Sequence, residues 1–177
     1  MLTKELLGNI TDIHIVHTPQ DHDGNIYVWY LNIKDYQYLC SQLQSDHIHF
    51  AAPNYMCLPY YPGDWTFSIE DNSILVRDGY YTGFCQQENL LILTLDKKLI
   101  EVGKPNTLHL LTSNHTILNT IRNWAKEKDI DIITEAPNQH HTDQIPTTIN
   151  LLAKIDTPKI KSRGLRAALI TFGSAVL

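Results

Sequence analysis

Residues 107–135 constrain the fold most, because they read as strand, tight turn, helix and strand. Apolar side chains form one stripe along the expected helix, at positions 117, 118, 121, 124 and 125. The side chain of Ser113 or of Asn114 can accept a hydrogen bond from the first free N–H groups of this helix, so either residue is a suitable N-cap. Residues 129–133 then alternate at period two. If the two strands are parallel neighbours, the unit is a βαβ crossover.

Residues 1–62 read as a small α+β extension. Two segments that alternate or are rich in β-branched and aromatic residues, 12–17 and 26–31, flank the turn-forming sequence DHDGN and predict an antiparallel hairpin. A short helix over 34–43 and a further strand over 47–50 follow. Three prolines make the next connection, residues 51–64, irregular. We therefore expect an N-terminal extension and a larger domain over 63–177. The Tyr, Met and Leu content of the connection leaves open that the two parts form one compact body.

The larger domain opens with expected strands at 65–69, 74–77 and 80–85. Residues 86–102 fit either one helix or two short strands. Their Leu and Glu content and the stop at Gly103 favour the helix.

The chain beyond the βαβ unit reads as loops and two further apolar segments. A polar loop over 136–144 leads to a helix predicted at 145–155. A basic loop then precedes a last apolar segment, 165–177, which is a docking helix or a strand.

Composition narrows the class of protein. The chain has 177 residues, 43% of them hydrophobic, and a net charge of −5, so a uniformly basic nucleic-acid-binding surface is not expected. Its three cysteines form no CxxC pair, which predicts buried thiols in a reducing compartment. The polar N-terminus does not fit a signal peptide, and no run reaches the roughly 20 apolar residues of a membrane span. We expect an intracellular protein, cytoplasmic or nuclear.

The order of the elements expected over residues 64–155 resembles that of the ribonuclease H fold. Short sequence motifs in this region resemble those of the retroviral-type RNase H domain of reverse transcriptases. Motifs of that family have counterparts at Asp71-Asn72-Ser73, Gly79, Gly83, Glu88, Thr112-Ser113-Asn114, His140 or His141, and Asn150. The resemblance implies an α/β fold, an RNase H-like mixed sheet with flanking helices, to which the first 62 residues add a small α+β extension.

The same resemblance implies a degenerate metal site. The family holds two Mg²⁺ ions with four carboxylates, and Mg²⁺ prefers anionic oxygen. Here Asp71 and Glu88 are the remnant catalytic and metal ligands, whereas Ser113 and Asn150 replace two carboxylates. We therefore expect no cofactor and a non-catalytic module of viral or retroelement type that binds an RNA–DNA hybrid or other nucleic acid, or is structural. An active enzyme would be a Mg²⁺-dependent nuclease that recruits other carboxylates, such as Asp78 or Asp143.

A second function class stays open, that of a protein-interaction or viral surface and assembly subunit. The sequence Lys161-Ser162-Arg163-Gly164 before an apolar tail resembles a cleavage junction of retroviral-type envelope proteins. Such a subunit would bind a protein partner or form a homo-oligomer through residues 165–177. Among the nine histidines, His47 and His49 would face one side of a strand and could supply half of a metal site.

Overall fold

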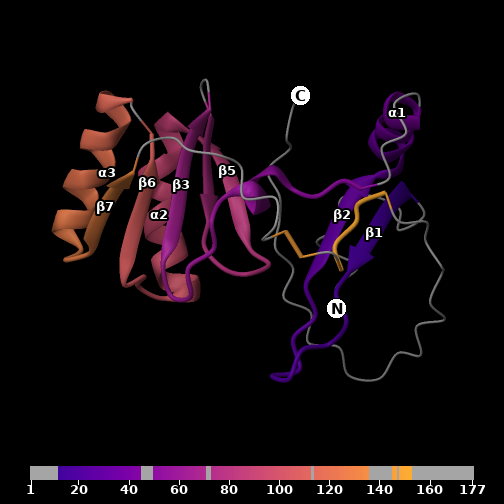
Figure 1. Cartoon of the computed structure of the whole chain (residues 1–177), viewed down its shortest axis with the longest axis horizontal. Helices are drawn as coiled ribbons and strands as arrows, with labels where there is room; N and C mark the ends of the chain where they lie inside the picture. The colour runs from indigo at the N-terminus through magenta and orange to yellow at the C-terminus, as the bar shows by residue number, and fades with distance from the viewer. Residues whose placement is uncertain are drawn as a thin grey trace. The chain divides into compact units, whose positions relative to one another are not determined.

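The computed structural model describes residues 12–44, 50–70, 73–112, 114–135, 145–146 and 148–152. They belong to two compact units (Figure 1). Unit 1 holds the described residues up to Ala52 and those from Pro146 onward, and unit 2 holds those from Pro53 to Ile145. Within the described part of the chain, no helix has the length and apolar character that crossing a membrane requires.

Unit 1 contains the predicted hairpin and helix. Strands β1 (Ile13–His17) and β2 (Val28–Asn32) pair antiparallel, and helix α1 (Ile33–Gln44) follows directly. The loop between the strands is closed by Asp21, whose Oδ1 accepts hydrogen bonds from the backbone N–H groups of Asp23 and Asn25 at 3.0 and 2.7 Å. The strand expected at 47–50 falls mostly outside the described residues.

The chain returns to unit 1 near residue 150. Asn150 Oδ1 accepts a hydrogen bond from the N–H of Ala51 at 3.1 Å, and the N–H of Leu151 donates to the carbonyl of Ala51 at 2.8 Å. The helix predicted at 145–155 is therefore wrong over the described residues, none of which is helical. Groups that a helix would use locally are engaged here in long-range hydrogen bonds.

Unit 2 is built on a mixed five-stranded sheet in the order β5-β4-β3-β6-β7. Its strands are β3 (Trp65–Glu70), β4 (Ser73–Arg77), β5 (Gly83–Gln87), β6 (Thr107–Leu111) and β7 (Asp131–Glu135). The β3–β4 and β4–β5 pairs are antiparallel, whereas β3–β6 and β6–β7 are parallel. The predicted class, an α/β mixed sheet with flanking helices and a small N-terminal α+β part, is confirmed.

Both helices of unit 2 form where the sequence favoured them. Residues 88–102 form helix α2 (Glu88–Val102), not two strands, and α3 (His115–Glu127) joins the parallel strands β6 and β7 in the predicted βαβ unit. Asn114 caps α3, because its side chain accepts from the N–H groups of Thr116 and Ile117 at 3.1 and 3.4 Å. Strand β7 starts two residues later than predicted, since Asp129 turns the chain with a φ of 54°.

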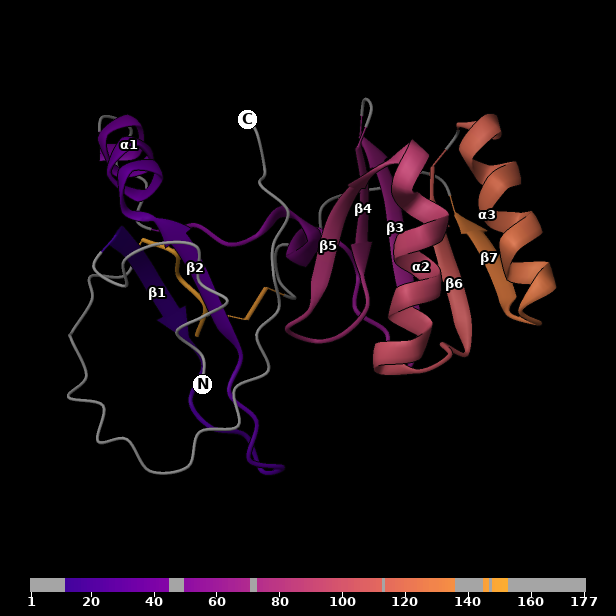
Figure 2. The same ribbon diagram turned by 180° about the vertical axis from the view of Figure 1, so that it is seen from behind.

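Helices α2 and α3 pack on one face of the sheet (Figure 2). Side chains alternate across a strand, so one set of each strand's residues faces the helices and the other set faces away. Leu108 and Leu110 of β6 belong to the core on the helix side. The opposite face is covered in part by the short 3-10 helix η3 (Asn54–Cys57) and by Leu58, which packs on Leu75 and Leu111. We call this side of the sheet the η3 face.

Arg77 fixes the η3 segment to the sheet. Its Nη1 donates to the carbonyls of Met56 and Leu58 at 3.0 and 2.7 Å, and Nη2 donates to that of Tyr80 at 2.9 Å. The first boundary between the units lies between Ala52 and Pro53, inside the proline-rich connection at 51–64.

Candidate functional site

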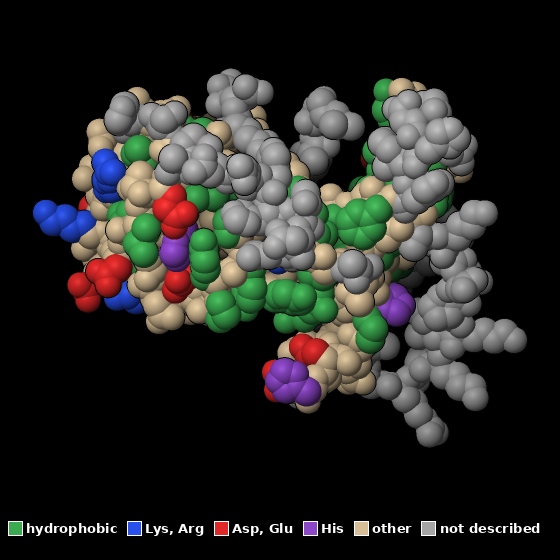
Figure 3. Space-filling model, in the orientation of Figure 1, with side chains coloured by type: hydrophobic (Ala, Val, Ile, Leu, Met, Phe, Trp, Pro, Cys, Tyr) green, Lys and Arg blue, Asp and Glu red, His purple; other side chains and the backbone are tan. Residues whose placement is uncertain are grey.

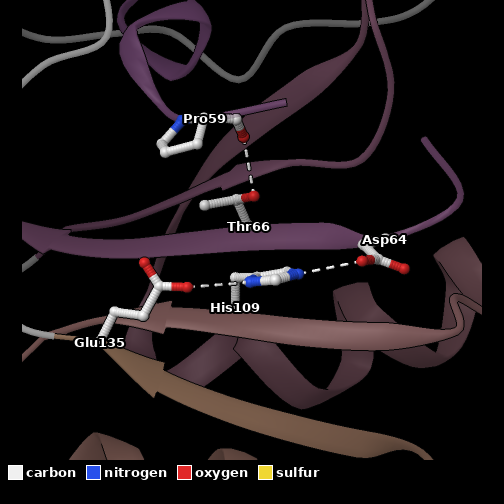
Figure 4. Close-up of polar contacts among 5 residues, drawn as sticks. All are labelled: Pro59, Asp64, Thr66, His109 and Glu135. Atoms are coloured by element: carbon white, nitrogen blue, oxygen red, sulfur yellow. Dashed lines mark hydrogen bonds and ion pairs between the residues drawn. The ribbon is translucent and has the colours of Figure 1, made fainter. Parts of the chain in front are cut away.

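A histidine between two carboxylates occupies the η3 face of unit 2 (Figure 4). His109 is the central residue of β6, aligned with Thr66 of β3 and Ile133 of β7. Asp64 and Glu135 lie two residues from these partners, so their side chains reach the same face. Three segments far apart in the sequence thus meet at one imidazole ring.

The ring contacts one carboxylate through each nitrogen. His109 Nε2 lies 2.9 Å from Asp64 Oδ2, and Nδ1 lies 3.2 Å from Glu135 Oε1. Tyr61 stacks on the ring, with centroids 4.1 Å apart. The side chains become more exposed along the cluster, from 9% for His109 and 18% for Asp64 to 41% for Glu135. Glu135 is therefore the member that a partner molecule can reach.

The number of hydrogen bonds that the His109 ring can donate depends on whether the ring is protonated. A neutral imidazole carries one N–H, so the ring donates to both carboxylates at once only when it is protonated. In that form the three groups together carry one negative charge. Burial raises the pKa of the Tyr61 phenol, and the negative charge of Glu135 raises it further, so this tyrosine stays neutral.

Aromatic and apolar side chains continue from the cluster across the η3 face. Tyr60 contacts Tyr80 edge to face, with centroids 5.3 Å apart, and Tyr80 is 46% exposed. On the other side, Ile133 is 47% exposed next to His109. Figure 3 shows hydrophobic side chains on both sides of a histidine that lies between acidic groups. Aromatic side chains such as Tyr80 are enriched at surfaces that bind other proteins.

A His–Asp pair can activate a neighbouring hydroxyl group as a nucleophile. The hydroxyl nearest in register, that of Thr66, donates to the carbonyl of Pro59 at 2.8 Å and is not directed at His109 (Figure 4). Among the described residues, no group of three or more His, Cys, Asp or Glu side chains is placed to hold a metal ion.

Glu88 and Asn150, two of the residues predicted from the sequence, do not belong to this cluster. Glu88 is exposed in the first turn of α2, and Asn150 belongs to unit 1, where its side chain holds the backbone of Ala51 and Leu152. Asp71 and Ser113 lie outside the described residues, so Mg²⁺ binding by Asp71 and Glu88 stays a prediction. Asp78 is no open ligand, since its side chain is buried 3.4 Å from Lys98 Nζ.

Several further predictions fall on residues that the structure does not describe. These are Asp143, the histidines at 47, 49, 140 and 141, the basic loop, and the tail at 165–177. The three cysteines are free, as expected, but half-buried.

The sequence did not single out Asp64, His109 or Glu135. Asp64 read as a turn residue, and Glu135 lay beyond the predicted strand. One signal was available, since His109 alternates with two leucines in a strand and so points away from the helix side. Its partners could be found only once the strand order was known.

No known protein-family model matches the chain, and no curated protein sequence matches it either. Among solved structures, the fold is similar to that of cyto-EpsL, the cytoplasmic domain of EpsL, an inner membrane component of the type II secretion system of Vibrio cholerae. The TM-score is 0.61 at 15% sequence identity, over 87% of this chain and 68% of that chain.

This similarity corrects the family prediction. The resemblance to a retroviral-type RNase H domain is wrong, and with it the function of a degenerate, nucleic-acid-binding viral or retroelement module. The motifs behind it were short words made of turn, cap and helix-start residues, such as Asp71-Asn72-Ser73. Such short motifs recur wherever strands and helices follow one another in this order. They therefore indicate the order of elements and not the family.

Proposed function

We propose that this chain is a protein-interaction domain that works on the cytoplasmic side of a membrane-embedded secretion assembly. The observation that carries the proposal is the similarity of fold to the cytoplasmic domain of EpsL over 87% of the chain. A fold is not a function, so the proposal also needs a surface suited to the task.

The η3 face of unit 2 supplies such a surface. Tyr80 and Ile133 are half-exposed hydrophobic side chains, and Tyr61 and Glu135 both contact the ring of His109. Aromatic side chains contribute large contact areas at protein interfaces, and a carboxylate held by a neighbour adds specificity at small ordering cost. His109 holds Glu135 in this way. Binding here would therefore combine apolar burial with an ion pair.

The proposal is tested by secretion in the organism that carries the gene. We expect a deletion strain to lose most of a secreted enzyme from the medium and retain it inside the cell, and a plasmid copy to restore it. Complementation by an Ile133→Asp variant should fail, whereas an Asn119→Asp variant, changed at an exposed position of α3, should succeed. Unchanged secretion in the deletion strain would remove the proposed function.

A further inference from the structure

Strand β7 ends the sheet of unit 2. Among the described residues it pairs with β6 alone, at one end of the order β5-β4-β3-β6-β7 (Figures 1 and 2). An edge strand presents a row of backbone N–H and C=O groups on its outer side, and another extended chain can pair with that row.

The side chains of β7 form a distinct pattern on the η3 face. Ile132 packs against the core on the helix side, so its alternate neighbours Asp131, Ile133 and Glu135 face the other way. Ile133 is 47% exposed and the Glu135 side chain 41% exposed, and Asp131 is exposed as well. The edge therefore reads acidic, apolar, acidic.

We infer that the β7 edge takes up an extended segment of a partner protein whose side chains alternate basic, apolar, basic. This inference rests on the proposed function and names its partner chemistry. An added strand would place its apolar side chain beside Ile133 and its basic side chains beside Asp131 and Glu135. Opposite-charge and apolar cross-strand pairs stabilise neighbouring strands, and main-chain hydrogen bonds supply the rest of the affinity.

The charges around the edge favour this occupant. Lys104 pairs with Asp129 at 3.7 Å. Arg122 contacts β7 on the helix side, where it donates to Thr134 Oγ1 at 3.2 Å, whereas Asp131 and Glu135 point to the opposite face. His109 Nδ1 holds Glu135 at 3.2 Å, so this carboxylate is ordered before a partner arrives. An acidic segment would instead meet like charges at both ends of the strand.

Synthetic peptides test the inference on the full-length protein. The probes are TKTVTKT, its acidic counterpart TETVTET, and a form of TKTVTKT with N-methyl groups on alternate residues, which removes the N–H donors of one edge. Binding is measured by amide chemical shifts and by hydrogen exchange. We expect TKTVTKT to protect β7 amides, and the other two peptides to leave them unchanged.

Variants of β7 provide the second arm. The double variant Asp131→Asn, Glu135→Gln should weaken TKTVTKT binding about tenfold. The control Glu127→Gln removes an exposed carboxylate from α3 and should change nothing. Equal binding of the N-methylated peptide would show charge attraction without strand pairing, and equal binding by the double variant would exclude the acidic residues; either result overturns the inference. If the deletion strain loses secretion as expected but no peptide binds, the β7 edge is not the binding site, and the proposed function still stands.

Discussion

At the scale of single residues, Arg77 is a buried charged group that links the η3 segment to the sheet of unit 2. Its guanidinium is buried, donates to four backbone carbonyls and lies 5.3 Å from the ring centroid of Tyr60. Burial lowers its pKa, but an arginine stays charged. The planar fork of donors fits several carbonyls at once, which an ammonium group cannot do.

We therefore predict that Arg77→Met lowers the free energy of unfolding by about 3 kcal/mol, because buried carbonyls lose their donors. Urea denaturation measures the change. Arg122→Met is the matched control, since Arg122 is exposed on α3, and it should cost no more than about 0.5 kcal/mol. Similar losses in both variants would mean that the carbonyl contacts of Arg77 contribute little.

His14 is a buried titratable group of unit 1, and we expect it to make the stability of this unit depend on pH. Its ring is 1% exposed and stacks on Tyr36 at 3.7 Å, and Nε2 contacts the carbonyl of Leu151 at 2.9 Å. Burial lowers the pKa of His14 below its ordinary value of 6.5, although the hydrogen bond to Leu151 opposes part of the shift.

The sign of the effect follows from proton binding. Below pH 6.5 the unfolded chain binds a proton at His14 that the folded chain does not, so acid favours unfolding. We predict that unit 1 loses more stability between about pH 7 and about pH 5 in the wild type than in His14→Gln. Hydrogen exchange of β1 amides reports this difference. Parallel pH profiles for the two proteins would contradict the assignment.

At the scale of elements, local signals in the sequence were reliable where short-range physics decides the outcome. Helix α3 has an apolar stripe and an Asn114 cap, and both can be recognised without tertiary information. The same holds for the β1–β2 hairpin around Asp21. The helix predicted at 145–155 failed because Asn150 bonds to Ala51, about a hundred residues away, and no local pattern contains that contact.

The N-cap can be tested directly. We predict that Asn114→Ala destabilises the protein by about 1 kcal/mol, because two N–H groups at the start of α3 lose their acceptor. Asn119→Ala, at an exposed position within the same helix, should be neutral or slightly stabilising, since alanine is the better helix former. Thermal or urea denaturation distinguishes the two. An equal effect at both positions would show that propensity, not capping, dominates.

At the scale of the whole molecule, the α/β class could be predicted from the order of elements, whereas the site could not. Asp64, His109 and Glu135 come from three separate segments, and only the order β3-β6-β7 brings them together. The exact division into units could not be predicted from the sequence either, because it depends on contacts between distant residues. Arg77 binds the carbonyls of residues 56 and 58, and Asn150 binds the backbone of Ala51. Family assignment failed for a related reason, since short motifs carry no information on which segments meet.

A photo-crosslinking amino acid placed at position 133, in cells that produce the full-length protein, tests most directly whether the β7 edge binds another protein. We predict an adduct with another component of the same secretion assembly, and no such adduct from position 119 on α3, which is exposed on a different element. The absence of a protein adduct at position 133, or equal adducts from both positions, would contradict the claim that this edge of the sheet is a protein-binding surface.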